Sequence, residues 1–338
     1  MLNWADFAPA SGRRILEDYR EQIPTFNDDL QGTGAITLAA AISASRICGA
    51  PLRNQRVVIF GAGTAGIGIA GQIRDAMVRE GLSKQEATGR FWCVDLHGLL
   101  TADMGDRLDA CQANYARPAA EVKGWKREGG AIGLAEVVHR VRPTMLIGTS
   151  TASGVFTQAL VQEVAAHTER PIIFPLSSPA PFAEATPGDL IAWTDQRALI
   201  ATGSSFGPVT HKGVTYVIGQ TNNAMLYPGL GLGAIMSRGA PDQRRHARGS
   251  GERPLQPRCR PPAWRAITPH VDNLRSVSTT VALTVVEAAL EEGLAGVELG
   301  DIVKQMQDAM WQPEYCRLRA SCLHRWWFRI YRRKVNAG

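Results

Sequence analysis

Short apolar runs alternate with longer stretches of helical periodicity through the middle of the chain. The runs are rich in β-branched residues, whereas the stretches between them place apolar residues three and four positions apart. The apolar runs are RVVIF (56–60), RFWCVDLHGLL (90–100), TMLIGTS (144–150) and RPIIFPLS (170–177), and the alternation continues through ALIATGSSF (198–206) and VTYVIGQTNN (214–223). Strands alternating with helices of about 10 to 15 residues predict βαβ units and a parallel sheet.

Helical periodicity marks the segments between the strands and both flanks of this region. The expected helices lie at 12–22, at 35–49, after a glycine-rich turn up to 81, and at 135–142, 156–167, 278–293 and 298–311. Near-continuous apolar strands are typical of a sheet that is covered on both faces. The pattern therefore predicts an α/β fold, a doubly wound (Rossmann-like) parallel sheet with helices on both faces and helical N- and C-terminal flanks.

Charge is distributed unevenly along the 338 residues. The net charge is +6, but Gly239–Ala266 carries +5 and Arg317–Gly338 carries +7, so the remaining residues carry −6. A basic protein would suggest nucleic acid as a partner. Because the basicity is confined to two segments without apolar periodicity, we expect an acidic globular body and no nucleic-acid binding. The competing interpretation, in which the basic segments bind nucleic acid or anionic lipid, predicts a steep salt dependence.

The two basic segments have an unusual composition. Gly239–Ala266 holds five prolines and seven arginines, and it interrupts the predicted helical pattern. We expect an irregular segment there. Out-of-frame translation of GC-rich DNA yields Arg, Pro and Gly, so our hypothesis is a local reading-frame change in this segment and again after Ser321. Translating the coding DNA in the other two frames tests it.

Membrane and redox signals are weak. The sequence holds no uninterrupted apolar window of about 18 residues, and its first residues do not resemble a secretory signal. The six cysteines form no CxxC pair. We therefore expect no membrane span, a cytoplasmic location, free thiols and no structural zinc site.

The glycine-rich turn carries the strongest chemical signal. Gly61, Gly63 and Gly66 form a GxGxxG pattern that follows an apolar strand and opens a helix. In that context the first glycine makes the tight turn, the second lets the backbone approach a pyrophosphate, and the third lets the helix pack on the strand. We expect Thr64 and Ala65, at the helix start, to line the same dinucleotide site.

An acidic residue at the end of the next strand should hold the ribose hydroxyls. Asp95 fits this role, although it lies further from Gly66 than is usual because of an extra loop. A carboxylate there repels a 2′-phosphate, so it favours NAD over NADP. A solvated strand-end aspartate is the alternative.

Two adjacent acids, Asp28 and Asp29, precede a Gly-Thr-Gly turn and an apolar helix. Two explanations stay open from the residues alone. Hard divalent cations take carboxylate ligands, whereas aspartate is also a common helix N-cap.

A series of ordered fragments resembles one family. They are FNDDLQGT, GAGTAGIGIA, VDLHGLL, LIGTSTASGVFT, RPIIFPLSSP, EATPGDLIAWT, ALIATGSSF, QTNNAMLYPGLGLGAI and DAMWQPEY. Together they are similar to the C-terminal, NAD-binding portion of malic enzyme, of the bacterial NAD-linked type. The resemblance covers about residues 3–238 and 268–320.

The resemblance implies oxidative decarboxylation of L-malate to pyruvate and CO₂, with reduction of NAD and a requirement for Mg²⁺ or Mn²⁺. It makes Asp29 a metal ligand and places Asp28 in the proton-transfer network. Asp6 corresponds to a second metal ligand, while Ala5 stands where the family has a glutamate, so metal affinity should suffer. Gln112 aligns with a position that is lysine in many NADP-linked relatives, which again favours NAD.

The same resemblance assigns the polar residues near the substrate. Asn223 should contact malate and Asn222 the cofactor. Ser178 stands where the family has an asparagine that contacts malate. A serine side chain can still form a hydrogen bond, but it reaches less far. L-malate is thus the expected small-molecule partner, and the family implies a homo-oligomer.

The family's catalytic Tyr and Lys belong to an N-terminal domain that precedes these motifs and that we do not find in the 338 residues. The chain is therefore expected to be an incomplete copy, or alternatively a catalytically inactive NAD-binding module. We divide it into a helical segment with part of the metal site (1–50), the NAD-binding domain (51–238), the irregular segment (239–266), C-terminal helices (267–320) and a basic tail (321–338).

Overall fold

The computed structural model describes residues 2–5, 7, 9–19, 22–237, 267–269, 271–295 and 302–310. Residues 1–300 form one compact unit, and residues 301–338 form a second unit that contains helix α12 (Ile302–Ala309). The hypotheses on Gly239–Ala266 and on the tail after Ser321 fall outside the described residues, and the proposed division into domains stays a prediction.

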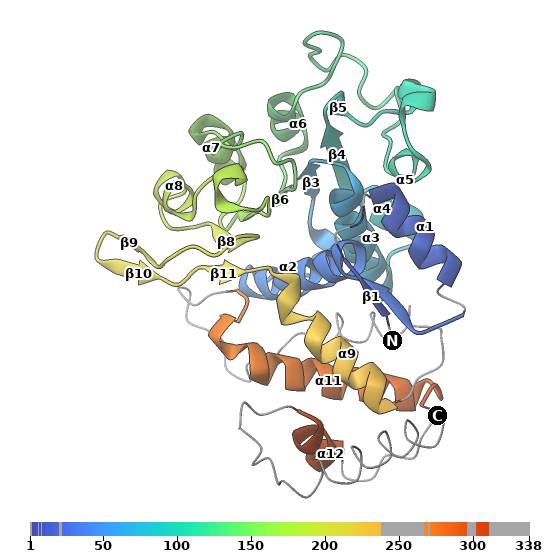
Figure 1. Ribbon diagram of the computed structural model, residues 1–338. Helices are drawn as coiled ribbons and strands as arrows, with labels where there is room; N and C mark the ends of the chain where they lie inside the picture. The colour runs from blue at the N-terminus through green and yellow to red at the C-terminus, as the bar shows by residue number, and fades with distance from the viewer. Residues whose placement is uncertain are drawn as a thin grey trace, which may run out of the picture. The chain divides into compact units, whose positions relative to one another are not determined.

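The centre of the larger unit is a seven-stranded sheet with the order β11-β8-β7-β6-β3-β4-β5 (Figure 1). Every neighbouring pair is parallel except β4 and β5, which are antiparallel. The chain goes from β3 to β4 on one side and then crosses to β6 on the other side, so the strand order reverses beside β3. The strands are β3 (Val57–Phe60), β4 (Phe91–Asp95), β5 (Gly98–Leu99), β6 (Met145–Gly148), β7 (Ile172–Pro175), β8 (Leu199–Thr202) and β11 (Gly219–Gln220).

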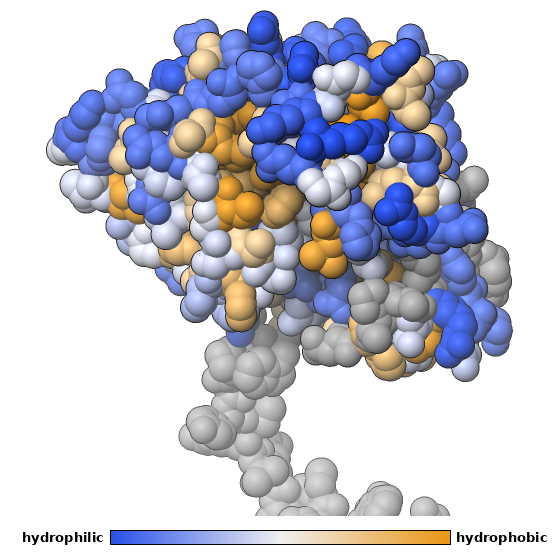
Figure 2. Space-filling view, turned by 90° about the horizontal axis from the view of Figure 1, so that it is seen from above, coloured by the Kyte–Doolittle hydropathy of each residue, from blue (hydrophilic) through white to orange (hydrophobic). Residues whose placement is uncertain are grey.

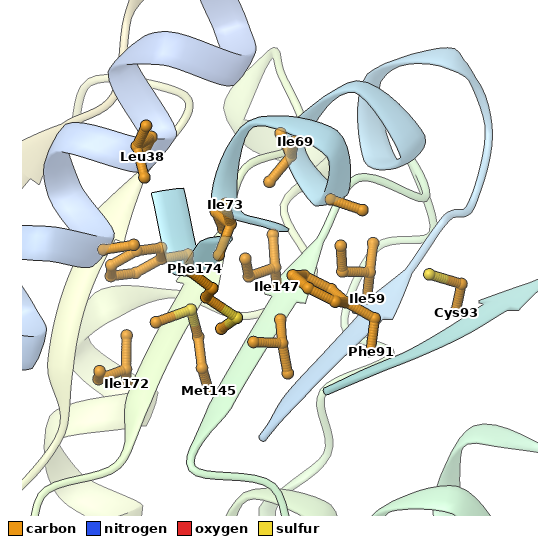
Figure 3. Close-up of a cluster of buried hydrophobic side chains, with 14 of the residues drawn as sticks. Leu38, Ile59, Ile69, Ile73, Phe91, Cys93, Met145, Ile147, Ile172 and Phe174 are labelled. Atoms are coloured by element: carbon orange, nitrogen blue, oxygen red, sulfur yellow. The ribbon is translucent and has the colours of Figure 1, made fainter. Parts of the chain in front are cut away.

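Helices cover both faces of the sheet, because successive side chains of a strand point to opposite sides. Val57 and Ile59 of β3 belong to the apolar cluster beneath α2 (Thr33–Ile47) and α3 (Thr64–Arg79), part of which Figure 3 shows. Val58, between them, belongs to the cluster on the opposite face. That face is covered by α6 (Leu134–Val141), α7 (Gln158–Ala166) and α8 (Pro187–Trp193). The predicted doubly wound fold is confirmed.

Segments from the N-terminal and C-terminal parts of the larger unit pack against helix α2. A third apolar cluster joins Ile36 of α2 with Phe26, with Leu230 of α9 (Tyr227–Ser237) and with Val281 of α11 (Leu274–Glu291). The predicted C-terminal helix therefore packs back onto the fold. The remaining elements are α1 (Pro9–Tyr19), α4 (Lys84–Thr88), α5 (Ala110–Ala113), the parallel pair β1 (Leu2–Trp4) and β2 (Thr25–Asn27), and the hairpin of β9 (Val209–His211) and β10 (Val214–Tyr216).

Two bulk expectations can be compared with the described residues. No helix among them is both long and apolar enough to span a membrane. The three cysteines in this part of the chain, Cys48, Cys93 and Cys111, are free thiols. Complete burial raises the pKa of Cys93 to about 12, so this thiol is a core residue rather than a reactive one.

Candidate dinucleotide site

The glycine-rich turn lies where the strand order reverses, at the carboxyl end of β3. Gly61 has φ +100°, and the amides of Gly61 and Ala62 both donate to the carbonyl of Val94 at the end of β4, at 2.9 and 3.1 Å. On the other side, the Thr149 hydroxyl after β6 donates to the Gly61 carbonyl at 2.7 Å. The turn is thus fixed between the strand ends that border the reversal, which is where doubly wound folds bind ligands.

The three glycines of the turn have different surroundings. A Cβ on Gly61 would lie 2.4 Å from the carbonyl carbon of Thr149, and a Cβ on Gly66 would lie 2.2 Å from the Gly61 carbonyl oxygen. Gly63, the N-cap of α3, is exposed, and a Cβ there would meet nothing within 4 Å. Gly61 and Gly66 are therefore required for packing, whereas the space above Gly63 is open to a ligand at the helix N-terminus.

Asp95 lies beside this turn, as the sequence predicted. The Gln112 side-chain amide donates to a carboxyl oxygen of Asp95 at 3.0 Å and to the carbonyl of Ala62 at 3.0 Å. Gln112 belongs to α5, whose N-terminus is capped by Asp109. One amide therefore connects the acid at the end of β4 to the glycine turn.

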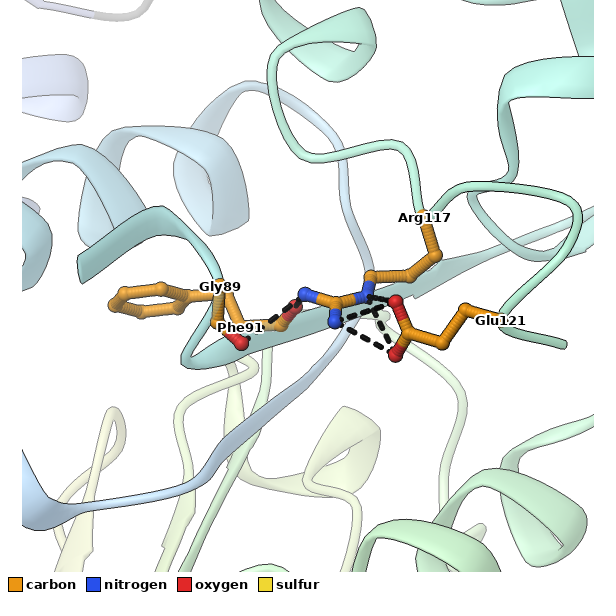
Figure 4. A network of polar contacts seen from close by, with 4 residues as sticks. All are labelled: Gly89, Phe91, Arg117 and Glu121. Atoms are coloured by element: carbon orange, nitrogen blue, oxygen red, sulfur yellow. Dashed lines mark hydrogen bonds and ion pairs between the residues drawn. The ribbon is translucent and has the colours of Figure 1, made fainter. Parts of the chain in front are cut away.

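Arg117 fastens the segment that carries Gln112 to the strand that carries Asp95 (Figure 4). Its guanidinium donates to the carbonyls of Gly89 and Phe91 at 3.0 and 3.3 Å and pairs with Glu121 at 2.6 Å. It also lies 4.7 Å from the centre of the Trp92 ring. Charge-assisted hydrogen bonds of this kind hold a loop more firmly than neutral ones do.

Asp28 and Asn223, 195 residues apart, lie in contact. The Asn223 amide donates to a carboxyl oxygen of Asp28 at 2.5 Å, and Asp28 is 5% exposed. Asp28 and Asp29 belong to a single π-helical turn (Asp28–Gly32), and such turns are frequent at functional sites. The cap of this turn is Asn27, whose side chain accepts from the Leu30 amide at 2.9 Å. Neither aspartate is therefore the N-cap itself, but both lie in the first turn after it, where acids favour the positive end of a helix.

The described residues offer only part of a metal site. Asp29 is half-buried, Asp6 lies outside the described residues, and the described part of the chain contains no group of three or more His, Cys, Asp or Glu side chains that could hold a metal ion. Carboxylate oxygens such as those of Asp29 are of the kind that a hard cation prefers, and metal binding at Asp29 stays a prediction.

The other predicted polar residues follow β7 and β11. Ser178, which is exposed, accepts from the hydroxyl of Ser204 at 3.2 Å. Asn222 uses its side-chain oxygen to accept from the Ala224 amide at 2.8 Å. Ser178 therefore follows β7 and contacts the segment after β8, while Asn222 holds the short turn that positions Asn223.

Sequence reasoning missed Glu184, the most buried acid near these strand ends. It is 0% exposed, and one of its carboxyl oxygens accepts from the Ser150 amide at 2.8 Å, the Ser150 hydroxyl at 2.9 Å and the Ser177 hydroxyl at 2.5 Å. Its other oxygen accepts from the Ser177 amide at 3.3 Å. Glu184 thus joins the loops that follow β6 and β7. Glu184 is the first residue of the family-like fragment EATPGDLIAWT, but a single acid among small residues does not by itself indicate a buried, hydrogen-bonded carboxylate.

The surface at this end of the molecule combines apolar and polar areas. Figure 2 shows several apolar patches on the face seen from above, with polar residues between and around them. Leu96, directly after Asp95, is 95% exposed. An exposed leucine beside the predicted ribose-binding acid offers an apolar surface that would suit a planar base.

Known proteins resemble this chain over most of its length. Residues 30–290 match the family described as malic enzyme, NAD binding domain. The chain is 51% identical over 324 residues to NAD-dependent malic enzyme 3 of Bacillus subtilis and 42% identical over 316 residues to a putative malate oxidoreductase [NAD] of Mycobacterium tuberculosis. It is also 41% identical over 321 residues to a malolactic enzyme of Lactiplantibacillus plantarum. These alignments cover 93–95% of this chain but 57% of each relative.

Solved structures agree on the fold. A malic enzyme from Pyrococcus horikoshii superposes with a TM-score of 0.69 at 25% identity, over 90% of this chain and 64% of that one. A malic enzyme from Entamoeba histolytica gives 0.64 at 23% identity, over 90% of this chain and 57% of that one. The chain therefore belongs to the malic enzyme family and carries its NAD-binding domain.

Proposed function

We propose that the chain binds NAD at the carboxyl end of β3, as one part of an enzyme that oxidatively decarboxylates L-malate to pyruvate and CO₂. The observation that carries the proposal is the contrast within the turn, where Gly61 and Gly66 are closely packed and Gly63 faces open space. A pyrophosphate over Gly63 would accept hydrogen bonds from the first amides of α3 and lie at its positive end.

Gly63→Ala should weaken NAD binding at least about tenfold without lowering the melting temperature, because the methyl group would occupy the space of the pyrophosphate. Gly133→Ala is the matched control: Gly133 is also an exposed helix N-cap, with φ −76°, and a Cβ there would likewise meet nothing within 4 Å. Calorimetric titration of both variants with NAD measures the effect. Equal NAD affinity in the two variants would place the cofactor elsewhere.

Asp95 should set the preference for NAD. Asp95→Asn keeps an oxygen that can accept from Gln112, yet it removes the charge that repels a 2′-phosphate. We expect the ratio of NAD to NADP affinity to fall at least about tenfold, since like charges a few ångströms apart cost several kcal/mol even when partly screened. Asp195→Asn, at an exposed acid paired with Lys212, should leave the ratio unchanged. An unchanged ratio in Asp95→Asn would assign the ribose to another group.

The substrate end of the proposed site combines Asp28, Asn223 and Ser178. Asn223 and Ser178 would donate hydrogen bonds to the carboxylates and hydroxyl of malate, and Asp28, held by Asn223, would accept a proton within reach of the substrate. Hydride transfer to the nicotinamide and loss of CO₂ are the chemistry that bound NAD and malate supply. Because the alignments cover 57% of each relative, we propose NAD binding without turnover as the second candidate function.

Divalent metal binding is also part of the proposal. Asp29 and Asp6 would contribute ligands for Mg²⁺ or Mn²⁺, whose role in this chemistry is to polarise the keto oxygen. The described carboxylates do not complete a coordination shell, so we assign no step of the reaction to a metal.

A turnover assay distinguishes the two candidate functions. We expect the 338-residue chain with L-malate, NAD and Mn²⁺ to form no NADH above background, even where calorimetry detects NAD binding. Asp29→Ala serves as the control. If NADH forms and Asp29→Ala abolishes it, the chain contains its own general acid and base, and the second candidate is wrong.

We further propose a cytoplasmic location and a homo-oligomer. The free thiols of the described cysteines fit a reducing compartment. Ile235 on α9 and Leu290 on α11 are 65% and 42% exposed, and such side chains suit contacts between subunits. Light scattering on the purified chain measures the oligomeric state.

A further inference from the structure

Glu184 is fully buried beside the proposed site, and the proposed function does not yet use it. Among the described residues it is the only aspartate or glutamate that is 0% exposed. Its backbone is fixed as well, because the Glu184 carbonyl accepts from the Phe156 amide at 2.9 Å and the neighbouring Ala183 carbonyl accepts from the Gly154 amide at 3.1 Å. The carboxylate therefore extends from a backbone that is itself held in place.

The Glu184 carboxylate lies against the last residue of β6. A Cβ on Gly148 would lie 2.4 Å from the carboxyl carbon of Glu184, so only a glycine leaves room for the carboxylate there. β6 pairs with β3 on one side and with β7 on the other. The carboxylate is thus placed between the strand that leads into the glycine turn and the strand that leads to Ser178.

One set of contacts connects Glu184 to the glycine turn. Ser150 donates its amide and its hydroxyl to the carboxylate, at 2.8 and 2.9 Å. The same amide nitrogen would lie 2.6 Å from a Cβ on Gly61, and the Thr149 hydroxyl donates to the Gly61 carbonyl at 2.7 Å. Because protein interiors are closely packed, a shift of Ser150 would be transmitted to Gly61.

A second set of contacts connects Glu184 to the loop that carries Ser178. Ser177 donates its hydroxyl and its amide to the carboxylate, at 2.5 and 3.3 Å. The Ser177 hydroxyl also accepts from the Thr151 amide at 2.8 Å, so it joins the loop after β7 to the loop after β6. Ser178 follows directly and accepts from the Ser204 hydroxyl at 3.2 Å. A shift of Ser177 would therefore move Ser178.

We propose that Glu184 is a positioning residue, whose carboxylate sets the distance between the glycine turn and Ser178. The inference rests on the proposed function, in which the turn holds NAD and Ser178 contacts malate. Four donors from two loops meet at one carboxylate, and hydrogen bonds to a charged acceptor are stronger than neutral ones. A side chain that is shorter, or that has a single acceptor oxygen, cannot hold both loops in these positions.

Calorimetric titration with NAD, far below the melting temperature, tests the proposal on two variants. Glu184→Gln keeps the length of the side chain but replaces one acceptor oxygen by a donor, whereas Glu184→Asp keeps the charge but is one methylene shorter. We expect NAD affinity to fall at least about fivefold in both.

Val138→Ala is the control for a merely structural role. Val138 is a buried core residue of α6, so its truncation should lower the melting temperature while the folded chain keeps the wild-type affinity for NAD. Wild-type affinity in either Glu184 variant, or an equal loss in Val138→Ala, overturns the proposal.

Amide NMR spectra recorded without NAD make the test independent of cofactor binding. In both Glu184 variants we expect the amide resonances of Gly61 and Ser178 to move, although these residues lie beyond the two serines that donate to the carboxylate. In the core control they should stay in place. Changes confined to the two serines contradict the proposal. If the wild-type chain binds no NAD, the proposed function fails, and these resonances alone decide the role of Glu184.

Discussion

Replacing Glu184 with alanine should lower the free energy of unfolding by roughly 2 to 6 kcal/mol. The side chain is fully buried and accepts hydrogen bonds from the amides and hydroxyls of Ser150 and Ser177. The hydroxyls can rotate toward other acceptors, but the two amides cannot, and each buried amide without a partner costs about 1 to 3 kcal/mol. For a domain that is stable by about 5 to 15 kcal/mol, this is a large fraction of the total.

Urea unfolding followed by circular dichroism measures the loss, and Glu86→Ala is the matched control. Glu86 also accepts from a backbone amide, that of Ser83 at 2.8 Å, but it is exposed. Water can replace its hydrogen bond, so the unfolding midpoint should change much less. Similar midpoints for the two variants would mean that burial does not determine the contribution of Glu184.

A Gly61→Ala chain should be destabilised by roughly 2 to 5 kcal/mol and should lose NAD binding. Two costs add up at this position. Alanine is strained at φ +100°, by about 1 to 2 kcal/mol, and its methyl carbon would lie 2.4 Å from the carbonyl carbon of Thr149, which only a shift of the backbone can relieve. Such a shift would separate the turn from the end of β6 and displace the helix N-terminus.

Gly49→Ala isolates the first cost, the strain, so that the second is obtained by difference. Gly49 also has a positive φ, +70°, but a Cβ there would meet nothing within 4 Å. It should therefore show the strain of a left-handed alanine alone, at about 1 kcal/mol. Thermal unfolding of both variants, with and without NAD, measures the difference. If Gly61→Ala were no less stable than Gly49→Ala, close packing against the end of β6 would not be what requires the glycine.

Local pattern was sufficient for much of this molecule. The alternation of apolar runs and helical stretches predicted the doubly wound sheet, because strand and helix periodicities differ and both faces of the sheet are covered. The position of the GxGxxG pattern after a strand predicted the turn at the reversal of the strand order. The position of Asp95 could be predicted for the same reason, since the end of the second strand in such a unit lies beside the first turn.

Local pattern was less reliable for element boundaries. The run at 90–100 divides into β4 and an antiparallel β5, because Leu96 and His97 form a turn between them. The run at 214–223 likewise divides between the hairpin strand β10 and the sheet strand β11. Both runs contain enough apolar and β-branched residues to resemble one strand, and only pairing with a neighbour decides where a strand ends.

The sequence by itself thus determined the class of fold, the position of the glycine turn after the first strand and the acid at the end of the next strand, because each of these leaves a local pattern in the chain. Tertiary structure alone decided that Asn223 holds Asp28, that Gln112 connects Asp95 to the glycine turn, and that Glu184 joins two loops. These contacts depend on burial and on side chains brought together across the sheet, for which a linear pattern carries no periodic signal.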